Sequence, residues 1–153
     1  MQGLVCGDGQ ERARLETVAR TLGLSVRFTG TVPAGEALAA MDVLLMTSRN
    51  EGLPLVAVEA ASCRVPVVAP AVGGLVDLIR WGAVEGAARS DSALAEACAR
   101  LLVAGPLRQS RLAAAERAAE HLTPARLAPA YAELYGNLMG TISAAARSGV
   151  QIC

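Results

Sequence analysis

Residues 43–70 read VLLMTSRNEGLPLVAVEAASCRVPVVAP, and this stretch decides the expected fold. Residues 43–46 form a short apolar run that ends in a polar loop. Residues 54–63 have the length of a short helix, with a proline in the first turn, where its missing N–H costs little. Residues 65–70 are again short and β-branched, with prolines near their ends. A strand, a helix and a second strand in this order predict parallel strands within one sheet.

The same alternation extends to both sides of this stretch. Gly23 follows a helical pattern, and glycine at that position favours the end of a helix. From residue 92 onward the pattern is helical, with breaks at residues 105–106 and 123–124. We therefore predict an α/β fold, a doubly wound and mostly parallel sheet followed by a helical carboxyl-terminal segment. The other expected strands span 4–6, 26–29 and, weakly, 85–89, and the other expected helices span 10–22, 36–41 and 75–80.

Composition excludes several classes of function. With 153 residues, 53% hydrophobic and 18% charged, the chain is long enough for one domain with a buried core. Its 14 basic and 14 acidic residues balance, so no nucleic-acid surface is expected. All basic residues are arginine, and the absence of lysine excludes P-loop and Schiff-base chemistry. The single histidine, His121, excludes a multi-histidine metal site.

The cysteines and the hydropathy pattern indicate a compartment. No Cys-x-x-Cys pair occurs, and a disulfide framework is not expected in a chain with this much apolar core. No signal peptide opens the sequence, and the longest uncharged apolar run, residues 65–76, is too short and too interrupted to span a bilayer. We therefore expect a soluble cytoplasmic protein. The four cysteines are Cys6, Cys63, Cys98 and Cys153.

Polar or glycine-rich segments follow four of the expected strands. Because ligands of open α/β sheets bind at the carboxyl ends of the strands, these segments are candidates for a ligand site. Alternatively, each supplies only the turn that a strand-to-helix connection requires. The segments are residues 7–9, 29–31, 48–52 and 73–74.

Two glutamates, Glu51 and Glu59, lie eight positions apart, one before the expected helix and one inside it. Eight helical residues span roughly 12 Å, comparable with the reach of a nucleotide diphosphate-sugar from ribose to hexose. The helix start between them offers free N–H groups and a positive dipole end, which suit a diphosphate. Carboxylates accept paired hydrogen bonds from vicinal hydroxyls, so we expect Glu51 near a sugar and Glu59 near a ribose.

Both glutamates also have a purely structural interpretation, in which Glu51 complements the helix dipole and Glu59 faces solvent. The apolar residues around Glu59 argue against a solvent-facing position, because they predict a helix buried nearly all round. A glutamate in such a helix needs a partner or a ligand. Nearby, Asn50 serves equally well as an N-cap, and Arg49 is a candidate replacement for a phosphate-binding cation.

The pattern of Glu51 and Glu59 within SRNEGLPLVAVEA (48–60) resembles the signature of retaining glycosyltransferase family 4, the glycosyl transferases group 1. Flanking segments agree in order and spacing over about residues 4–135. They are VCGDG (5–9), VRFTG (26–30), MDVLLMTS (41–48), VPVV (65–68) and the glycine pair at 73–74. The family has the GT-B architecture, in which two Rossmann-like domains flank the active site. This chain resembles the carboxyl-terminal, donor-binding domain.

The resemblance implies a UDP-, GDP- or ADP-sugar donor, no further cofactor and no metal. Glu51 would contact the hexose at the reacting centre and Glu59 the ribose, while helix-start amides would meet the diphosphate and the end of strand 26–30 would face the base. Front-face attack without a protein nucleophile is the mechanism commonly proposed for the family. The implied donor-binding residues are Gly7, Gly9, Phe28, Gly30, Ser48, Gly52, Leu53, Leu55, Val56, Glu59, Gly73 and Gly74.

The resemblance also implies missing parts. The family's donor domain begins with a further strand-loop-helix unit that supplies an arginine and a lysine to the diphosphate, and an acceptor domain precedes it. Pro54, Asp77 and residues 80–82 also depart from the usual pattern. We expect residues 1–122 to be a nucleotide-sugar-binding domain without its first unit and residues 123–153 to be a helical extension. The isolated chain is expected to be a poor catalyst or none.

The extension and the partners leave alternatives open. Its apolar positions, 127, 131, 134, 135, 138 and 142, fit a helix that crosses onto another domain or joins two copies of the chain, and equally one that packs on its own sheet. Expected partners are the donor and an acceptor domain, in cis or as a separate chain. A non-catalytic nucleotide-binding or interaction module is the alternative function. A flavodoxin-like regulatory domain is disfavoured, because no acidic cluster follows the first strand.

Overall fold

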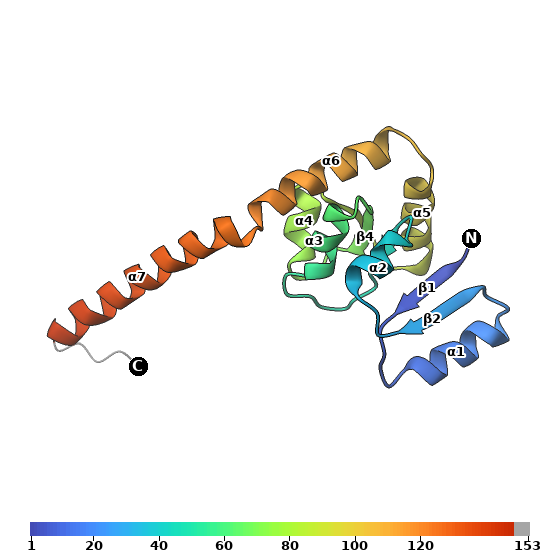
Figure 1. The fold of residues 1–153 in the computed structure, drawn as a ribbon, viewed down its shortest axis with the longest axis horizontal. Helices are drawn as coiled ribbons and strands as arrows, with labels where there is room; N and C mark the ends of the chain where they lie inside the picture. The colour runs from blue at the N-terminus through green and yellow to red at the C-terminus, as the bar shows by residue number, and fades with distance from the viewer. Residues whose placement is uncertain (149–153) are drawn as a thin grey trace.

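The computed structural model describes residues 1–148 and the side chains of residues 1–140. The described residues therefore exclude the end of the expected helical extension, with Cys153. The described side chains exclude Ile142. Strands and helices alternate up to residue 102, and two longer helices follow (Figure 1). The elements are β1 (Gly3–Cys6), α1 (Arg12–Thr21), β2 (Val26–Gly30), α2 (Ala34–Ala39), β3 (Leu44–Leu45), α3 (Leu55–Ser62), β4 (Val67–Pro70), α4 (Leu75–Arg80), β5 (Val84–Ala87), α5 (Asp91–Leu102), α6 (Pro106–His121) and α7 (Pro124–Ser148).

The parallel strands form two separate sheets instead of the single sheet that the sequence predicts. β1 pairs with β2, and β3, β4 and β5 form a second sheet in that order. The α/β class with parallel strands is confirmed, but no strand within residues 1–148 lies between β1 and β3. Each of these two strands therefore has a hydrogen-bonded neighbour on one side only.

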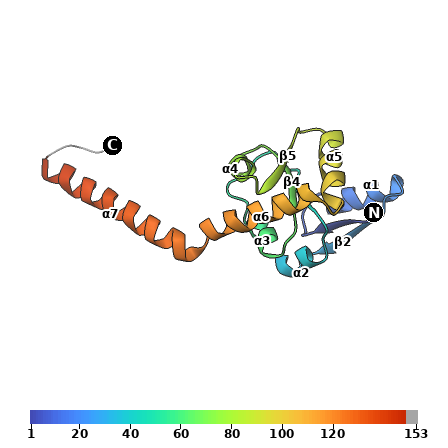
Figure 2. The same ribbon diagram turned by 90° about the horizontal axis from the view of Figure 1, so that it is seen from above.

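The hydrophobic core surrounds the three-stranded sheet. Residues 65–70 are all buried, as expected of a central parallel strand that is covered on both faces. Successive side chains point to opposite faces: Val67 and Ala69 join the cluster with α3, α4 and α6, whereas Val68 packs against α5. Figure 2 shows α3 and α5 on different sides of β4.

Most expected elements are present with small shifts at their ends. Gly23 ends α1 as predicted, with a positive φ of 62° and its N–H bonded to the Arg20 carbonyl at 3.1 Å. The strand expected over 43–46 is shorter, because only Leu44 and Leu45 pair with β4. The weakly expected strand at 85–89 is present as β5, shifted by one to two residues.

The apolar face of α1 is only partly covered. Its spacing predicts that Leu15, Val18, Ala19 and Leu22 face a core, but only Ala19 is buried. Leu15 and Val18 are each 39% exposed, and Leu22 is 64% exposed. The unit formed by β1, α1 and β2 therefore leaves apolar surface that no element within the described chain covers.

Helix α7 extends away from the α/β portion (Figure 1). Tyr131, Leu134, Tyr135 and Leu138 are each 49–61% exposed, and the two tyrosine rings stack on each other at 6.4 Å between centroids. Packing of this helix on its own sheet, one of the expectations above, is therefore wrong for residues 124–140. Within residues 1–148, the helices are all too short or too polar to cross a membrane.

An ion cluster around one buried glutamate joins the last strand to two helices. Glu85 on β5 is only 8% exposed and accepts hydrogen bonds from Arg100 of α5 at 3.0 Å and Arg111 of α6 at 2.7 Å. Burial alone would raise the pKa of Glu85, but the bonds and charges of the two arginines outweigh it and hold that pKa below its ordinary value. The carboxylate therefore stays charged and connects α5 and α6 across the sheet edge.

We predict that Glu85→Gln lowers the free energy of unfolding by about 1–3 kcal/mol at pH 7, because it removes two charge-assisted hydrogen bonds. Because the pKa of Glu85 is lower in the folded than in the unfolded state, the ionised carboxylate stabilises the fold at pH values above the ordinary glutamate pKa of about 4.3. This stabilisation is lost as the pH falls through the lower pKa of the folded state. The difference between wild type and variant should therefore shrink in acid. Urea unfolding at pH 7 and at pH 3 measures both effects.

The matched control is Glu116→Gln, which breaks an ion pair with Arg64 in which both side chains are exposed. We expect it to change the unfolding free energy by less than about 1 kcal/mol. An equal loss in both variants would show that the Glu85 cluster has no special role in stability.

Candidate functional site

The four polar segments follow β1, β2, β3 and β4, as the sequence predicts. They fall into two groups, because the sheet is divided. Residues 7–9 and 29–31 belong to the two-stranded sheet, and residues 48–52 and 73–74 belong to the three-stranded sheet.

The glycine pair after β4 contacts the loop after β3 directly. The Gly74 N–H donates to the Gly52 carbonyl at 2.8 Å and, more weakly, to the Glu51 carbonyl at 3.3 Å. A Cβ atom on Gly73 would lie 1.7 Å from the Glu51 carbonyl oxygen, and one on Gly74 would lie 2.1 Å from the Gly52 carbonyl oxygen. Only glycine allows this approach, so the pair fixes the backbone that carries Glu51.

The loop after β3 leads into α3, which begins at Leu55 after Pro54. Pro54 provides no side-chain cap, so the first N–H groups of the helix, on Leu55 and Val56, have neither an intrahelical acceptor nor a cap. The Leu55 side chain is 67% exposed, so this helix start is open to a ligand. Free N–H groups at an open helix start favour an anion.

Glu59 lies on the exposed side of α3, and the sequence-based expectation of a helix buried nearly all round is wrong. Ala57, Ala60 and Ala61 pack into the core, while Leu55, Glu59 and Ser62 face outward. The small alanines bury one face, and the residues on the opposite face stay exposed. Since residues four apart share a helix face, Glu59 lies about 6 Å along the axis from the helix start at Leu55.

The two glutamates keep their carboxylates available. Glu51 is partly buried and Glu59 exposed. Within residues 1–140, no hydrogen bond or ion pair joins either carboxylate to a protein side chain, although the Glu51 backbone carbonyl is engaged by Gly74. By contrast, Glu85 uses its carboxylate fully within the fold. Ser48, Gly52 and Leu53 line the same loop between β3 and α3.

The end of the two-stranded sheet gathers the remaining predicted residues. The Gly7 N–H donates to the Gly30 carbonyl at 2.7 Å, and both glycines have positive φ, 112° and 72°. The Gly9 N–H binds the Asp8 carboxylate at 3.0 Å, so this turn stabilises itself. Phe28, on β2, is partly buried.

Arg12 is a residue at this end that the sequence analysis did not single out. Its guanidinium donates to the Phe28 carbonyl at 3.4 Å and lies 3.1 Å from where a Cβ on Gly30 would be. It also pairs with Glu16 at 2.9 Å and Asp8 at 3.8 Å. The i, i+4 spacing of Asp8, Arg12 and Glu16 in the sequence could have predicted these ion pairs.

The structure does not join the two groups of predicted residues. In the described part of the chain, no hydrogen bond or ion pair connects residues 7–9 or 28–30 with the loop that carries Glu51. No three His, Cys, Asp or Glu side chains within the described residues are grouped as metal ligands. The chain thus has an open helix start with one free carboxylate before it and one after it in sequence, groups that suit a ligand carrying both phosphate and hydroxyl groups.

The profile of the family "Glycosyl transferases group 1" matches residues 1–104, so the chain belongs to this family. The D-inositol 3-phosphate glycosyltransferase of Geodermatophilus obscurus is 39% identical over 142 residues, which cover 84% of this chain and 32% of that protein.

Solved structures agree with the family assignment. The sucrose-phosphate synthase of Thermosynechococcus elongatus superposes with a TM-score of 0.78 at 27% identity, over 90% of this chain and 38% of that one. The Anabaena protein HepE, solved in complex with UDP-glucose, superposes with a TM-score of 0.66 at 25% identity, over 78% of this chain and 36% of that one. The structural neighbours are GT-B glycosyltransferases, and the chain spans about a third or less of the length of the curated relatives that it matches.

We predict that Gly74→Ala displaces the loop that carries Glu51. The φ of Gly74 is −65°, which alanine adopts freely, so the obstacle is the collision of the added Cβ with the backbone of Gly52 and Leu53. We expect a loss of about 1–3 kcal/mol in unfolding free energy, together with amide chemical-shift changes at residues 51–53. Gly35→Ala is the control, because a Cβ there meets nothing within 4 Å. Equal effects of the two substitutions would contradict this role for Gly74.

Proposed function

We propose that this chain is the donor-binding half of a retaining glycosyltransferase, which moves a hexose from a nucleotide diphosphate-sugar to an acceptor. The observation that carries the proposal is the pair Glu51 and Glu59, which precede and follow the open start of α3 along the chain and whose carboxylates have no protein partner within residues 1–140. The UDP-glucose held by the related HepE protein supports this class of donor.

Each part of a nucleotide-sugar has a matching group in this arrangement. The N–H groups of Leu55 and Val56 bind the diphosphate at the helix start, where the dipole favours negative charge. Glu59, one turn along the same face, accepts hydrogen bonds from the ribose diol. Glu51, held by the glycine pair, accepts from the hexose hydroxyls and places the anomeric carbon.

The base lies at the end of β2. In this assignment Gly7, Gly9, Phe28 and Gly30 form the wall that faces the base, and Ser48, Gly52 and Leu53 border the sugar and phosphates. Gly73 and Gly74 act by positioning Glu51. No nucleophile is needed on the protein, because the acceptor attacks the anomeric carbon on the face that the phosphate leaves, and the phosphate takes the acceptor's proton.

The negative charge that develops on the leaving diphosphate limits the catalytic activity of the isolated chain. Two arginines are engaged with carboxylates of the chain, Arg12 with Asp8 and Glu16 and Arg80 with Asp77. Arg49 is exposed in the loop after β3 and is the nearest cation in sequence to the helix start. Because one cation leaves much of the developing charge unbalanced, the isolated chain is a poor catalyst, and the remaining cations come from another part of the enzyme.

Helix α7 is the element that reaches this other part. Its half-exposed residues Leu134, Tyr135 and Leu138, with Tyr131, have no covering element within residues 1–140. In this proposal the acceptor domain, in cis or as a separate chain, buries this stripe. Two copies of the chain burying each other's stripe are the alternative.

The competing function is a nucleotide-binding or interaction module without catalysis. It shares the open helix start and Glu59 but gives Glu51 no role, since no hexose is present. The response of Glu51 variants therefore distinguishes the two functions.

We predict that the chain binds a nucleoside diphosphate and binds its sugar conjugate more tightly. Glu59→Gln should weaken both about tenfold or more, because charge-assisted hydrogen bonds to the ribose are lost. Glu51→Gln should weaken only the sugar conjugate. Calorimetric titration with UDP, GDP and ADP and with their glucose conjugates measures each affinity.

Glu36→Gln serves as the matched control for this titration, since Glu36 lies exposed on α2, a helix that carries none of the candidate site residues. Unchanged affinity in Glu59→Gln would contradict the ribose assignment. Equal weakening of the diphosphate and of the sugar conjugate by Glu51→Gln would contradict the hexose assignment.

We also predict that transfer requires the rest of the enzyme. The isolated chain should transfer no glucose from UDP-glucose to D-inositol 3-phosphate, the test acceptor. A chimera that adds the unmatched portion of the Geodermatophilus relative should transfer it. Glu51→Gln in the chimera should reduce transfer about a hundredfold or more, consistent with the loss of a stabilising group at the reacting centre. Transfer by the isolated chain at the rate of the chimera would overturn the proposal that this chain is half of an enzyme.

A further inference from the structure

One guanidinium nitrogen of Arg12 lies at the end of β2 without a hydrogen-bond acceptor in the described part of the chain. Nε of Arg12 donates to the Glu16 carboxylate at 2.9 Å, and Nη2 donates to the Phe28 carbonyl at 3.4 Å. Nη1 has only an ion pair with the Asp8 carboxylate at 3.8 Å, which is longer than a hydrogen bond. The N–H groups of Nη1 are therefore free to bind a ligand.

The backbone around this nitrogen both fixes it and leaves it uncovered. The contacts with Glu16 and Phe28 hold the guanidinium from two sides, so its direction is set before a ligand arrives. A Cβ on Gly30 would lie 3.1 Å from Nη1, and the glycine leaves that place empty. Nη1 is thus a preorganised donor at the end of the strand.

Asp8 supplies an acceptor beside this donor. Its Oδ1 accepts the Gly9 N–H at 3.0 Å, whereas Oδ2 is the oxygen 3.8 Å from Arg12 Nη1 and accepts no hydrogen bond within residues 1–140. The Asp8 side chain is exposed, and the hydrogen bond from the Gly7 N–H to the Gly30 carbonyl joins the ends of β1 and β2 that carry the pair. A free donor and a free acceptor therefore lie next to each other.

Nucleobases divide into two classes by the same pair of groups. Uracil, guanine and hypoxanthine present a carbonyl oxygen next to a ring N–H, whereas cytosine and adenine present an amino group next to a ring nitrogen that accepts. A donor beside an acceptor complements the first class, and it sets donor against donor and acceptor against acceptor in the second. Proteins use the hydrogen bonds of these edges to distinguish bases.

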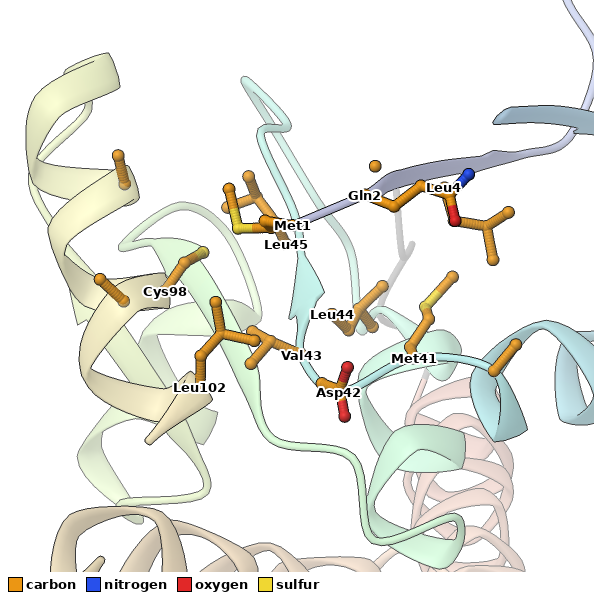
Figure 3. A pocket seen from close by; sticks show the side chains of 14 residues that line it. Met1, Gln2, Leu4, Met41, Asp42, Val43, Leu44, Leu45, Cys98 and Leu102 are labelled. Carbon is orange, nitrogen blue, oxygen red and sulfur yellow. The ribbon is translucent and has the colours of Figure 1, made fainter. Parts of the chain in front are cut away.

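The cavity on the amino-terminal side of β1 does not offer such a pair. It has a volume of about 590 Å³ and is lined by residues 1–4, residues 40–45 and part of α5 (Figure 3). Most of these side chains are apolar, and the two polar ones, Gln2 and Asp42, come from different elements (Figure 3). No arginine within the described residues lines this cavity. The groups that suit the edge of a base are at the carboxyl end of the strand.

We infer that Arg12 and Asp8 recognise the base of the donor and select a base with a carbonyl oxygen next to a ring N–H, uracil or guanine, over adenine and cytosine. Arg12 Nη1 donates to the carbonyl oxygen, and Asp8 Oδ2 accepts from the ring N–H. This inference rests on the proposed function, in which the base lies at the end of β2, and it adds the class of base and the two residues that determine it.

The test compares nucleotides that differ only at this edge of the base. UDP and CDP form one such pair, and inosine diphosphate and ADP form another, since each pair exchanges a carbonyl and a ring N–H for an amino group and a bare ring nitrogen. We expect the full chain to bind UDP at least about tenfold more tightly than CDP, and inosine diphosphate at least about tenfold more tightly than ADP. Calorimetric titration measures the four affinities.

Variants of the two residues should remove this preference. Arg12→Gln and Asp8→Asn each introduce an amide, which both donates and accepts, so each ratio should fall to within about twofold. Arg14→Gln is the matched control, because Arg14 is an exposed arginine on the same helix that pairs with Glu11, and it should leave both ratios unchanged. Glu59→Gln should weaken all four nucleotides by the same factor, because they share the ribose.

The outcomes separate this inference from the proposed function. Equal binding of UDP and CDP by the wild type, with the Glu59→Gln effect present, would overturn the inference and leave the proposed function standing. Equal weakening of all four nucleotides by Arg12→Gln and by Asp8→Asn would also overturn it, because that pattern shows a structural role alone. Binding of none of the four nucleotides would overturn the proposed function, and the inference with it.

Discussion

The hydrogen bond from the Gly74 N–H to the Gly52 carbonyl is the contact on which the candidate site depends. It connects the loops that leave β3 and β4, and it does so at a distance that no side chain on either glycine of the pair would allow. Glu51 is placed by this contact, and α3 begins three residues beyond Gly52. The position of Glu59 then follows from the packing of the buried alanines of α3 on the sheet and on α6. The site is therefore built by backbone proximity and small side chains.

Charge is distributed in two distinct ways in this fold. Glu85 is nearly buried and bound by Arg100 and Arg111, so it contributes to structure. Glu51 and Glu59 have no cation beside them within the described residues, which leaves their oxygens free for hydroxyl groups. In the proposed function these oxygens bind the hydroxyl groups of the donor, while few cations are left for its phosphates. That imbalance agrees with a chain that spans only part of its glycosyltransferase relatives.

Local patterns in the sequence were sufficient to predict the elements and the family. The run of buried residues at 65–70 and the glycines at 23 and 73–74 identified a central strand and two turns correctly, because these features depend on neighbours in the chain. The division of the sheet was not predicted, since the pairing of strands distant in the chain depends on tertiary packing that local periodicity does not reveal.

The candidate site was predicted in part for the same reason. The contact of residues 73–74 with Glu51 and Gly52 joins segments about twenty positions apart, and it was expected only as a set of separate turns. The expectation of a helix buried nearly all round Glu59 was wrong, because the alanines and valines around it do not show which side of α3 the sheet covers, and the alternative in which Glu59 faces solvent was correct. Arg12 was missed because its contacts with Phe28 and Gly30 come from the tertiary fold.

The partly covered face of α1 has a consequence for folding cooperativity. Leu15, Val18 and Leu22 are exposed, and the unit of β1, α1 and β2 shares little buried surface with the three-stranded core. Such a unit opens at a lower free energy than the rest of the molecule, as a separate foldon. Thermal or urea denaturation of this chain then has two transitions, and a single unfolding free energy describes only the core around β4.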